Sequence, residues 1–234
     1  IDSQNSNSGR SDAIMILTID SVKGKIKLSS IIRDSYVFIE GRGMDKINHA
    51  YSFGGPQLAL KTLNQNFNLD IRHFITVNFS SMPKVIDKLG GVYLDISEKE
   101  AAVISGIDSA GTHLLNGKQA LAFSRIRKID SDFERSRRQR DVMESLIRRV
   151  LERNITEYPE LAREIFPLLH TNVDKNKILL SGATVIFRDI RTIEQARFPG
   201  ADYAKGQTIN GVYYYVFDRI AAVNEIGRFI YLDE

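Results

Sequence analysis

Arginines are concentrated in one short stretch of this 234-residue chain. Between residues 125 and 140, seven basic residues stand against three acidic ones, although the whole chain carries a net charge of only +3. The rest of the chain is therefore close to neutral. Because a guanidinium pairs with phosphate oxygens through parallel hydrogen bonds, this distribution indicates a site for a compact polyanion such as phosphate or pyrophosphate. The bulk charge is too small to indicate a long nucleic-acid track.

A long helix, predicted over residues 132–154, positions part of this cluster. Its buried face is defined by Val142, Leu146 and Val150. Residues three or four apart lie on the same face of a helix, so Gln139 and Arg138 share the face of Val142, and Arg135 shares the face of Arg138. A buried arginine needs an anionic partner, and a helix N-terminus adds amide donors for an anion. We therefore expect Arg135 to bind a phosphate, with an ion pair to Asp132 or another acid as the alternative.

Arg125 and Arg127 precede this helix and stand two residues apart. On an extended segment, both side chains point to the same face. The loop over residues 128–134 is long enough to bring the pair back over the start of the helix. The sequence therefore predicts that Arg125 and Arg127 join Arg135 in one phosphate site, and a solvated edge strand guarded by charge is the alternative.

Acidic residues that could hold a metal lie near the start of the chain. Residues 13–19 and 26–32 are predicted strands of a hairpin with Gly24 in its turn, and antiparallel pairing then brings Asp12 close to Arg33. Asp2 and Asp12 flank a polar loop. Magnesium is commonly bound by one or two carboxylates together with a substrate phosphate. The pair therefore predicts a magnesium site, with a role as a turn residue as the alternative for Asp12.

The remaining pattern alternates predicted strands and helices, which favours an α/β protein with a mixed sheet and a single domain over residues 1–234. Gly54, Gly55 and Pro56 predict the start of a helix. The absence of cysteine excludes thiol catalysis and cysteine-based zinc sites. No glycine-rich phosphate loop or serine nucleophile elbow is present. Without metal spacing or a partnered carboxylate pattern, the histidines are interpreted as structural or surface residues: His49, His73, His113 and His170.

Five ordered blocks of the chain resemble the LytR-CpsA-Psr family of bacterial cell-envelope proteins. The first block contains Gly9-Arg10-Ser11-Asp12, the second Arg33-Asp34-Ser35, and the third Lys46-Ile47-Asn48-His49-Ala50-Tyr51. The last two blocks cover residues 116–127 and 132–139. Together they span residues 1–153, so the resemblance is specific for that part of the chain.

The resemblance implies a three-layer α-β-α sandwich around a mixed central sheet, with a hydrophobic tunnel for a lipid. It implies a phosphotransferase that moves a glycopolymer, such as teichoic acid or capsular polysaccharide, from a polyprenyl-pyrophosphate carrier to peptidoglycan. It also implies a single-pass N-terminal membrane anchor outside this sequence, with the catalytic domain on the extracytoplasmic side of the cell membrane. No nucleic-acid partner is expected.

Roles for individual residues follow from the same resemblance. The residues expected to hold the pyrophosphate are Arg33, Arg125, Arg127, Arg135 and Gln139, with Arg10 nearby. Asp2 and Asp12 would bind Mg²⁺. Arg33, Asp34 and Arg135 are the expected catalytic residues, with Asp34 as a candidate base for the acceptor hydroxyl. Gln4 stands where the family often has an arginine, so one phosphate contact is expected to be absent or weaker.

Three other functions are compatible with the same residues. A polyprenyl-pyrophosphate hydrolase would differ only in using water instead of a glycan hydroxyl. A non-catalytic transcription-regulating module would use the arginines for nucleic acid, but no helix-turn-helix spacing or interleaving of basic and aromatic residues supports it. A non-catalytic carrier of polyprenyl lipid would use them for binding alone.

Overall fold

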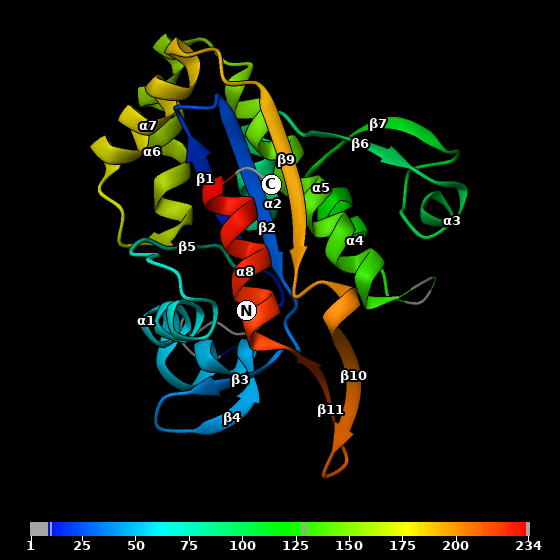
Figure 1. The fold of residues 1–234 in the computed structure, drawn as a ribbon. Coiled ribbons are helices and arrows are strands. Elements are labelled where there is room, and N and C mark those ends of the chain that lie inside the picture. The colour runs from blue at the N-terminus through cyan, green and yellow to red at the C-terminus, as the bar shows by residue number, and fades with distance from the viewer. Residues whose placement is uncertain (1–8, 10, 128, 130, 233–234) are drawn as a thin grey trace. The chain divides into compact units, whose positions relative to one another are not determined.

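The structure is a computed structural model that describes residue 9 and residues 11–127, 129 and 131–232 (Figure 1). The chain divides into two compact units. The first comprises residues 1–18, 26–74 and 194–234, and the second comprises residues 19–25 and 75–193. Both contain helices and strands, so the α/β class predicted from the sequence is confirmed. Within the described residues, no helix combines the length and apolarity needed to cross a membrane.

The predicted hairpin at the start of the chain is confirmed. Strands β1 (Ile14–Asp20) and β2 (Lys25–Ile31) are neighbours in a three-stranded sheet of order β1-β2-β9, in which β9 is Thr192–Phe198 (Figure 1). Gly24 stands in the connection with φ of +69°, a conformation that glycine adopts without steric cost. Strand β2 is almost wholly buried because both faces of it are covered.

The first unit contains two further hairpins. One consists of β3 (Tyr36–Ile39) and β4 (Gly43–Lys46), and the other of β10 (Ala204–Ile209) and β11 (Val212–Phe217). Two helices complete the unit, α1 (Ile47–Phe67) and α8 (Arg219–Gly227). Its core includes Val37, Ile39, Ala50, Leu63, Phe67, Phe198 and Ile226.

Helix α1 begins nine residues before the start predicted from Pro56. Gly54 and Gly55 interrupt it with non-helical dihedral angles, and Pro56 begins the part that follows the kink. The prediction therefore located the kink and missed the segment from Ile47 onward. That segment supplies backbone amides to the loop of the candidate site described below.

The second unit surrounds a core that includes Ile86, Val92, Leu115, Phe123 and Leu146. The two-stranded sheets are β6 (Val92–Ile96) with β7 (Gly111–Leu115), and β5 (Ile75–Thr76) with β8 (His170–Thr171). The helices are α2 (Met82–Lys88), α3 (Glu98–Ala101), α4 (Gly117–Arg125), α5 (Asp132–Leu151), α6 (Tyr158–Ile165) and α7 (Lys175–Phe187). Short 3₁₀ turns are Ile155–Glu157, Phe166–Leu168 and, in the first unit, Ala201–Tyr203, and a π turn at Arg228–Leu232 follows α8.

Helices α2 and α4 approach closely at Gly117, which yields a stability prediction. A Cβ at this position would lie 2.1 Å from the carbonyl oxygen of Pro83 and 2.5 Å from its Cα, so backbone would have to move. Gly117→Ala is expected to lower the free energy of unfolding by about 2–3 kcal/mol, measured by urea denaturation. Gly182→Ala, whose new methyl group meets nothing within 4 Å, is the control. An equal effect of the two substitutions would contradict the prediction.

Candidate functional site

Charged side chains of the first unit meet at the end of strand β2. The guanidinium of Arg33 lies 3.8 Å from Asp12 Oδ1 through its Nη1, and its Nε donates to Asp34 Oδ2 at 3.3 Å. Lys46 Nζ lies 2.8 Å from Asp34 Oδ1. The prediction that strand pairing brings Asp12 to Arg33 is therefore confirmed. All four side chains are partly exposed, between 14% and 26%, so they form a charged surface that a ligand can reach.

Backbone hydrogen bonds hold the loop that carries Arg33 and Asp34. The first two amides of helix α1 donate to it: Ile47 N to the Ser35 carbonyl at 2.9 Å, and Asn48 N to the Arg33 carbonyl at 3.2 Å. Tyr215 N in β11 donates to the carbonyl of Asp34 at 2.8 Å. The loop is therefore fixed from two elements, which pre-organises its side chains.

Lys46 is a member of this cluster that the sequence analysis did not single out. Besides its ion pair with Asp34, its ammonium lies 5.7 Å from the ring centroid of Tyr214 and 6.0 Å from that of Tyr213. Tyr36 packs against Tyr214 with centroids 4.6 Å apart. The signal in the sequence was its place at the start of a block that resembles the family.

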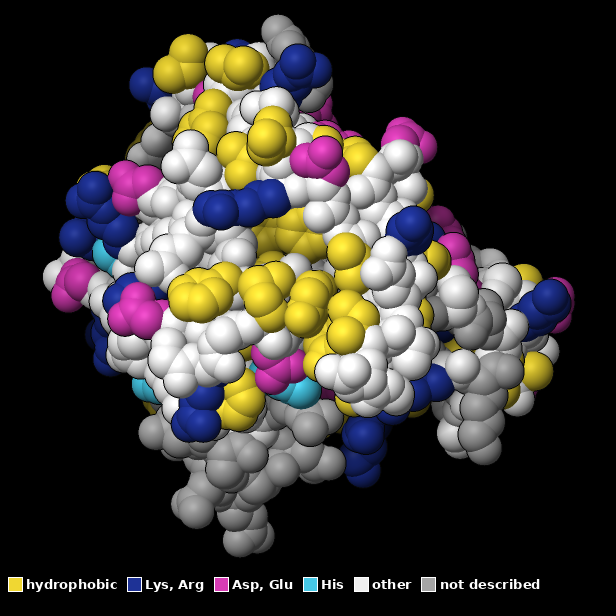
Figure 2. Space-filling view, turned by 60° about the horizontal axis from the view of Figure 1, so that its bottom comes forward, with side chains coloured by type: hydrophobic (Ala, Val, Ile, Leu, Met, Phe, Trp, Pro, Cys, Tyr) yellow, Lys and Arg dark blue, Asp and Glu magenta, His cyan; other side chains and the backbone are white. Residues whose placement is uncertain are grey.

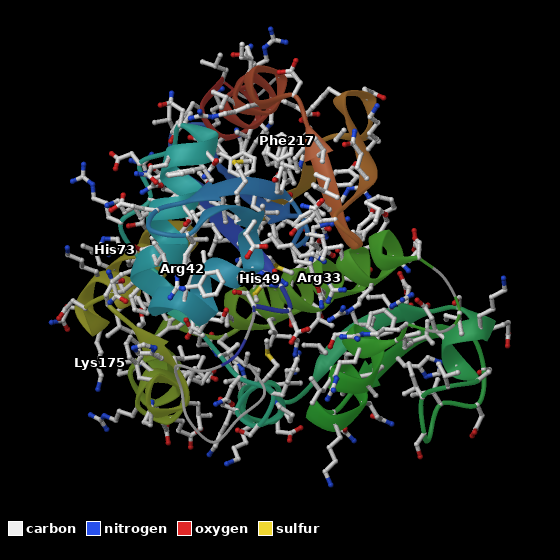
Figure 3. All side chains as sticks on the ribbon, turned by 90° about the horizontal axis from the view of Figure 1, so that it is seen from below. Arg33, Arg42, His49, His73, Lys175 and Phe217 are labelled. Atoms are coloured by element: carbon white, nitrogen blue, oxygen red, sulfur yellow. The ribbon has the colours of Figure 1, made fainter. Side chains whose placement is uncertain are left out.

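The sequence analysis expected no carboxylate partner for His49, and that expectation was wrong. Its Nδ1 lies 2.8 Å from Asp45 Oδ2, four residues earlier. Asp45 belongs to strand β4 and His49 to the first turn of α1, so the pair was hidden when the helix was expected to begin at Pro56. Phe53 contacts the His49 ring edge-on, and the Arg42 guanidinium lies 4.6 Å from the centroid of the Phe53 ring. Arg42 and His49 lie near each other in Figure 3.

In the second unit, Arg125 ends helix α4 and does not lie on the extended segment predicted for it. The capping box at Asn116 and Gln119 starts that helix, and Ile126, with ψ of 129°, leaves it. Ile126 is buried while Arg125 and Arg127 are exposed on either side of it. Exposed and buried side chains therefore alternate over residues 125–127, as the prediction of two arginines on one face requires. The Arg125 guanidinium lies 4.6 Å above the ring of Phe79.

The buried stripe predicted on the long helix is confirmed for its arginines. Arg135 is 3% exposed and Arg138 is fully buried, whereas Gln139 is partly buried. Arg138 donates to Glu100 Oε1 at 3.2 Å and to the carbonyl of Ile126 at 3.0 Å. Arg138 is therefore held by an acid of the protein itself.

Glu100 is a buried anion that Arg137 and Arg138 share. Burial alone would raise the pKa of Glu100, but hydrogen bonds from Ser97 N and Oγ and from Arg138 outweigh it and hold this pKa below its ordinary value. Arg137 reaches the same carboxylate at 3.2 Å and also pairs with Glu134 and Asp141. This network fixes the start of α5, on which Arg135 is located.

The predicted phosphate ligands are divided between the units. Asp12 and Arg33 belong to the first, whereas Arg125, Arg127, Arg135 and Gln139 belong to the second, and each group is described by itself. Asp2 and Arg10 lie outside the described residues. Within the described part of the chain, no three His, Asp or Glu side chains form a metal-binding group. A partly exposed carboxylate such as Asp12 still fits Mg²⁺, which often takes only one or two protein carboxylates and completes its shell with phosphate and water.

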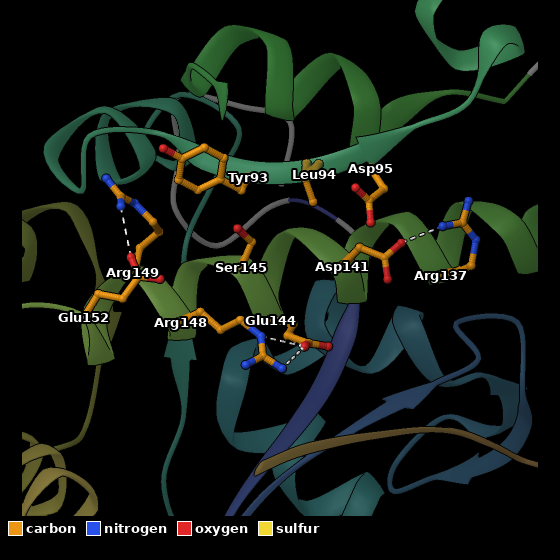
Figure 4. Close-up of a pocket in the computed structure, with 10 residues that line it drawn as sticks. All are labelled: Tyr93, Leu94, Asp95, Arg137, Asp141, Glu144, Ser145, Arg148, Arg149 and Glu152. Carbon is orange, nitrogen blue, oxygen red and sulfur yellow. Dashed lines mark hydrogen bonds and ion pairs between the residues drawn. The ribbon is translucent and has the colours of Figure 1, made fainter. Parts of the chain in front are cut away.

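A cleft of about 430 Å³ lies in the second unit between β6 and α5 (Figure 4). Its arginines pair with acids on helix α5 or at its C-cap: Arg137 with Asp141 at 2.6 Å, Arg148 with Glu144 at 2.6 Å and Arg149 with Glu152 at 3.0 Å. The cleft is too polar to be the lipid tunnel that the resemblance implies, and that tunnel stays a prediction.

Apolar side chains are also exposed beside the cations. Figure 2 shows hydrophobic side chains gathered in rows on one face of the molecule, with Lys and Arg side chains next to them. In the first unit, Phe38, Met44 and Tyr213 each keep 49% of their surface exposed. Contiguous exposed apolar surface is typical of sites that bind apolar ligands, proteins or membranes.

Comparison with known proteins places this geometry in context. The LytR_cpsA_psr family model matches residues 1–226. The polyisoprenyl-teichoic acid–peptidoglycan teichoic acid transferase TagU of Oceanobacillus iheyensis is 38% identical over 232 residues, covering 92% of this chain and 68% of that protein. Regulatory protein MsrR of Staphylococcus aureus is 33% identical over 195 residues, covering 81% of this chain. The chain spans only 59% of the length of MsrR, which is less than two thirds.

Solved structures agree with these relatives. TagT bound to LIIa-WTA matches with a TM-score of 0.81 at 28% identity, covering 96% of this chain and 85% of that one. TagT with bound octaprenyl pyrophosphate lipid matches with a TM-score of 0.77 at 25% identity and the same coverage of both chains. TagT is a B. subtilis protein. These matches confirm the α/β fold that the resemblance implies.

Proposed function

This chain belongs to the LytR-CpsA-Psr family, and we propose that it transfers a glycopolymer such as teichoic acid from a polyprenyl-pyrophosphate carrier to peptidoglycan. The observation that carries the proposal is the cluster of Asp12, Arg33, Asp34 and Lys46, which lies in the blocks resembling the family. The chemistry of the ligands in the TagT structures, a pyrophosphate lipid among them, supports the same assignment.

The reaction needs positioning and charge neutralisation more than a covalent nucleophile. The oxygen of an acceptor hydroxyl, which we take to be that of a muramic acid, attacks the sugar-linked phosphorus. The bond from that phosphorus to the bridging oxygen breaks, and polyprenyl phosphate leaves with the electron pair. The Arg33 guanidinium is held by Asp34 through its Nε, and it is the group that we assign to the phosphate oxygens.

We assign the other residues predicted to bind the phosphate to the same role of donating hydrogen bonds to its oxygens. Arg125 and Arg127 are exposed and offer guanidinium forks to phosphate oxygens, and Arg135 with Gln139 adds donors from helix α5. Asp34 has both carboxylate oxygens in ion pairs, so it orients Arg33 and Lys46. Asp12 would hold Mg²⁺, which when bound supplies further positive charge to the phosphate oxygens.

The substrates set the place of action. A polyprenyl-linked donor resides in a membrane, and peptidoglycan lies outside the cytoplasm. We therefore propose that this domain works at the outer surface of the cell membrane, held there by an anchor outside the sequence described here.

Release of polyprenyl phosphate from the proposed donor tests the proposed function. The protein is incubated with a synthetic polyprenyl-pyrophosphate-linked glycopolymer, peptidoglycan and Mg²⁺, and polyprenyl phosphate is quantified by mass spectrometry. Time-dependent release above that of boiled protein is the expected result. Absence of release across protein and donor concentrations would overturn the proposal.

The metal assignment makes a separate prediction. Removal of divalent ions with EDTA is expected to lower turnover by about 10²-fold, and added Mg²⁺ to restore it. Asp12→Ala is expected to raise the Mg²⁺ concentration needed for half-maximal turnover, because one oxygen ligand is lost. Asp70→Ala, which removes an exposed acid of the same unit paired with Arg72, is the control. Unchanged turnover in EDTA, or equal Mg²⁺ requirements for both variants, would contradict the assignment.

A further inference from the structure

Strand β11 carries three consecutive tyrosines, and they differ in how far they are buried. Tyr215 is 4% exposed, and Tyr214 packs against Tyr36 with ring centroids 4.6 Å apart. Tyr213 instead keeps 49% of its surface exposed. Two of the three side chains therefore contribute to packing, whereas the third presents an aromatic ring to the solvent.

The Tyr213 ring rests on a glycine of the neighbouring strand β10. A Cβ at Gly206 would lie 2.6 Å from Tyr213 Cε2 and 2.8 Å from the Tyr213 hydroxyl oxygen. In the antiparallel register Gly206 is opposite Tyr215, so it is a diagonal neighbour of Tyr213 on the same face of the hairpin. A larger residue at position 206 would displace the ring. The absence of a side chain at Gly206 therefore allows the ring to lie against the strand.

The exposed ring lies beside the charged cluster of the first unit. The Lys46 ammonium is 6.0 Å from the centroid of the Tyr213 ring and 2.8 Å from Asp34 Oδ1. Tyr215, two residues further along β11, donates its backbone N–H to the carbonyl of Asp34 at 2.8 Å. The strand that carries the ring is therefore bonded directly to the loop of Arg33 and Asp34.

An exposed aromatic ring next to a phosphate site is suited to binding a sugar. The face of an aromatic ring carries negative potential, and the C–H groups on one side of a sugar ring are apolar and weakly positive, so the two rings stack. The phosphate assigned to Arg33 is bonded to the first sugar of the glycopolymer. Because of that bond, the sugar must lie close to the cluster whenever the donor is bound.

We infer that Tyr213, supported by Gly206, stacks on the sugar that is bonded to the transferred phosphate. The inference rests on the proposed function. It makes Tyr213 a residue that distinguishes a sugar-linked donor from a polyprenyl pyrophosphate without a sugar. The lipid chain and the sugars of the acceptor are the other groups that could cover this ring, and the experiment separates them from the donor sugar.

The test measures the affinity of the protein for two lipids that differ only in the sugar. Polyprenyl pyrophosphate, alone or bearing one N-acetylglucosamine, is titrated by calorimetry in detergent with Mg²⁺. Tyr213→Leu is expected to weaken binding of the sugar-bearing lipid about tenfold and to change binding of the sugar-free lipid by less than about twofold. Tyr213→Phe keeps the ring and is expected to bind both lipids within about twofold of the wild type.

Two further variants show whether the seat of the ring matters. Gly206→Ala leaves Tyr213 in place but displaces its ring, so it is expected to weaken binding of the sugar-bearing lipid alone. Tyr231→Leu removes a tyrosine of the same unit that is 57% exposed, and this control is expected to bind both lipids as the wild type does. Binding of the sugar-free lipid by each variant shows that it is folded.

The possible results are distinct. Wild-type affinity of Tyr213→Leu for the sugar-bearing lipid would overturn the inference. An equal loss of affinity for both lipids would also overturn it, because the ring would then contact the lipid chain or act on the pyrophosphate through Lys46. A change confined to the KM for peptidoglycan would assign the ring to an acceptor sugar instead. Sugar-dependent binding without release of polyprenyl phosphate would reject the proposed function and leave the contact between Tyr213 and the sugar standing.

Discussion

Arg33→Ala is expected to lower kcat/KM for the polyprenyl-pyrophosphate donor by about 10³-fold. The substitution removes the planar fork that neutralises charge on the phosphate oxygens as the transferred group leaves. It also takes a cation from beside Asp12 and Asp34, so the local charge facing the anionic donor becomes more negative. The quantity to measure is steady-state release of polyprenyl phosphate at several donor concentrations.

Matched variants give this prediction its specificity. Arg33→Lys keeps the charge and loses the fork, so an intermediate loss is expected. Arg72→Ala removes an arginine of the same unit that is 77% exposed and paired with Asp70, and it should leave kcat/KM unchanged. If Arg33→Ala is folded and retains more than about a tenth of wild-type kcat/KM, Arg33 does not bind the phosphate in the transition state.

Glu100→Ala is expected to lower the free energy of unfolding by about 3–5 kcal/mol. Glu100 is 3% exposed and Arg138 is fully buried, so removal of the carboxylate leaves a buried guanidinium with one of its anionic contacts gone. Arg137 loses a contact as well, and Ser97 loses the partner that caps helix α3. Urea denaturation at neutral pH measures the effect.

The difference in free energy of unfolding between the wild type and Glu100→Ala is expected to depend on pH, because the pKa of Glu100 is lowered in the folded protein. A carboxylate whose pKa is lower when folded stabilises the protein above its unfolded pKa, and that contribution disappears as the pH falls through the folded pKa. The gap in stability between wild type and Glu100→Ala should therefore be constant near neutrality and narrow in acid. Glu98→Ala, an exposed acid of the same helix, is the control with an expected effect of about 0.5 kcal/mol. A gap that widens on acidification would contradict this account of Glu100.

Elements with a strong periodic pattern were predictable from the sequence. The hairpin of β1 and β2 follows from two apolar runs around Gly24, and antiparallel pairing of those runs is enough to place Asp12 near Arg33. The spacing of apolar residues on α5 placed Arg135 and Arg138 on the buried face, as observed. In both cases local pattern and tertiary burial lead to the same result.

Other features could not be predicted because distant contacts decide them. The early start of α1 depends on amides of Ile47 and Asn48 that donate to carbonyls of an earlier loop, and no local helix signal precedes them. The partner of Arg138 is Glu100, 38 residues away, which spacing on one helix cannot reveal. The pairing of His49 with Asp45 crosses a strand-to-helix boundary and was missed for the same reason.

The most direct test of the central claim is identification of the bond that the protein forms. The wild type is supplied with polyprenyl-pyrophosphate-linked glycopolymer and peptidoglycan, the wall material is digested to muropeptides, and the products are analysed by mass spectrometry. The account predicts a phosphodiester between glycopolymer and muramic acid, formed in step with polyprenyl phosphate. Release of polyprenyl phosphate with the glycopolymer recovered only as its free phosphate would show a hydrolase and contradict the account.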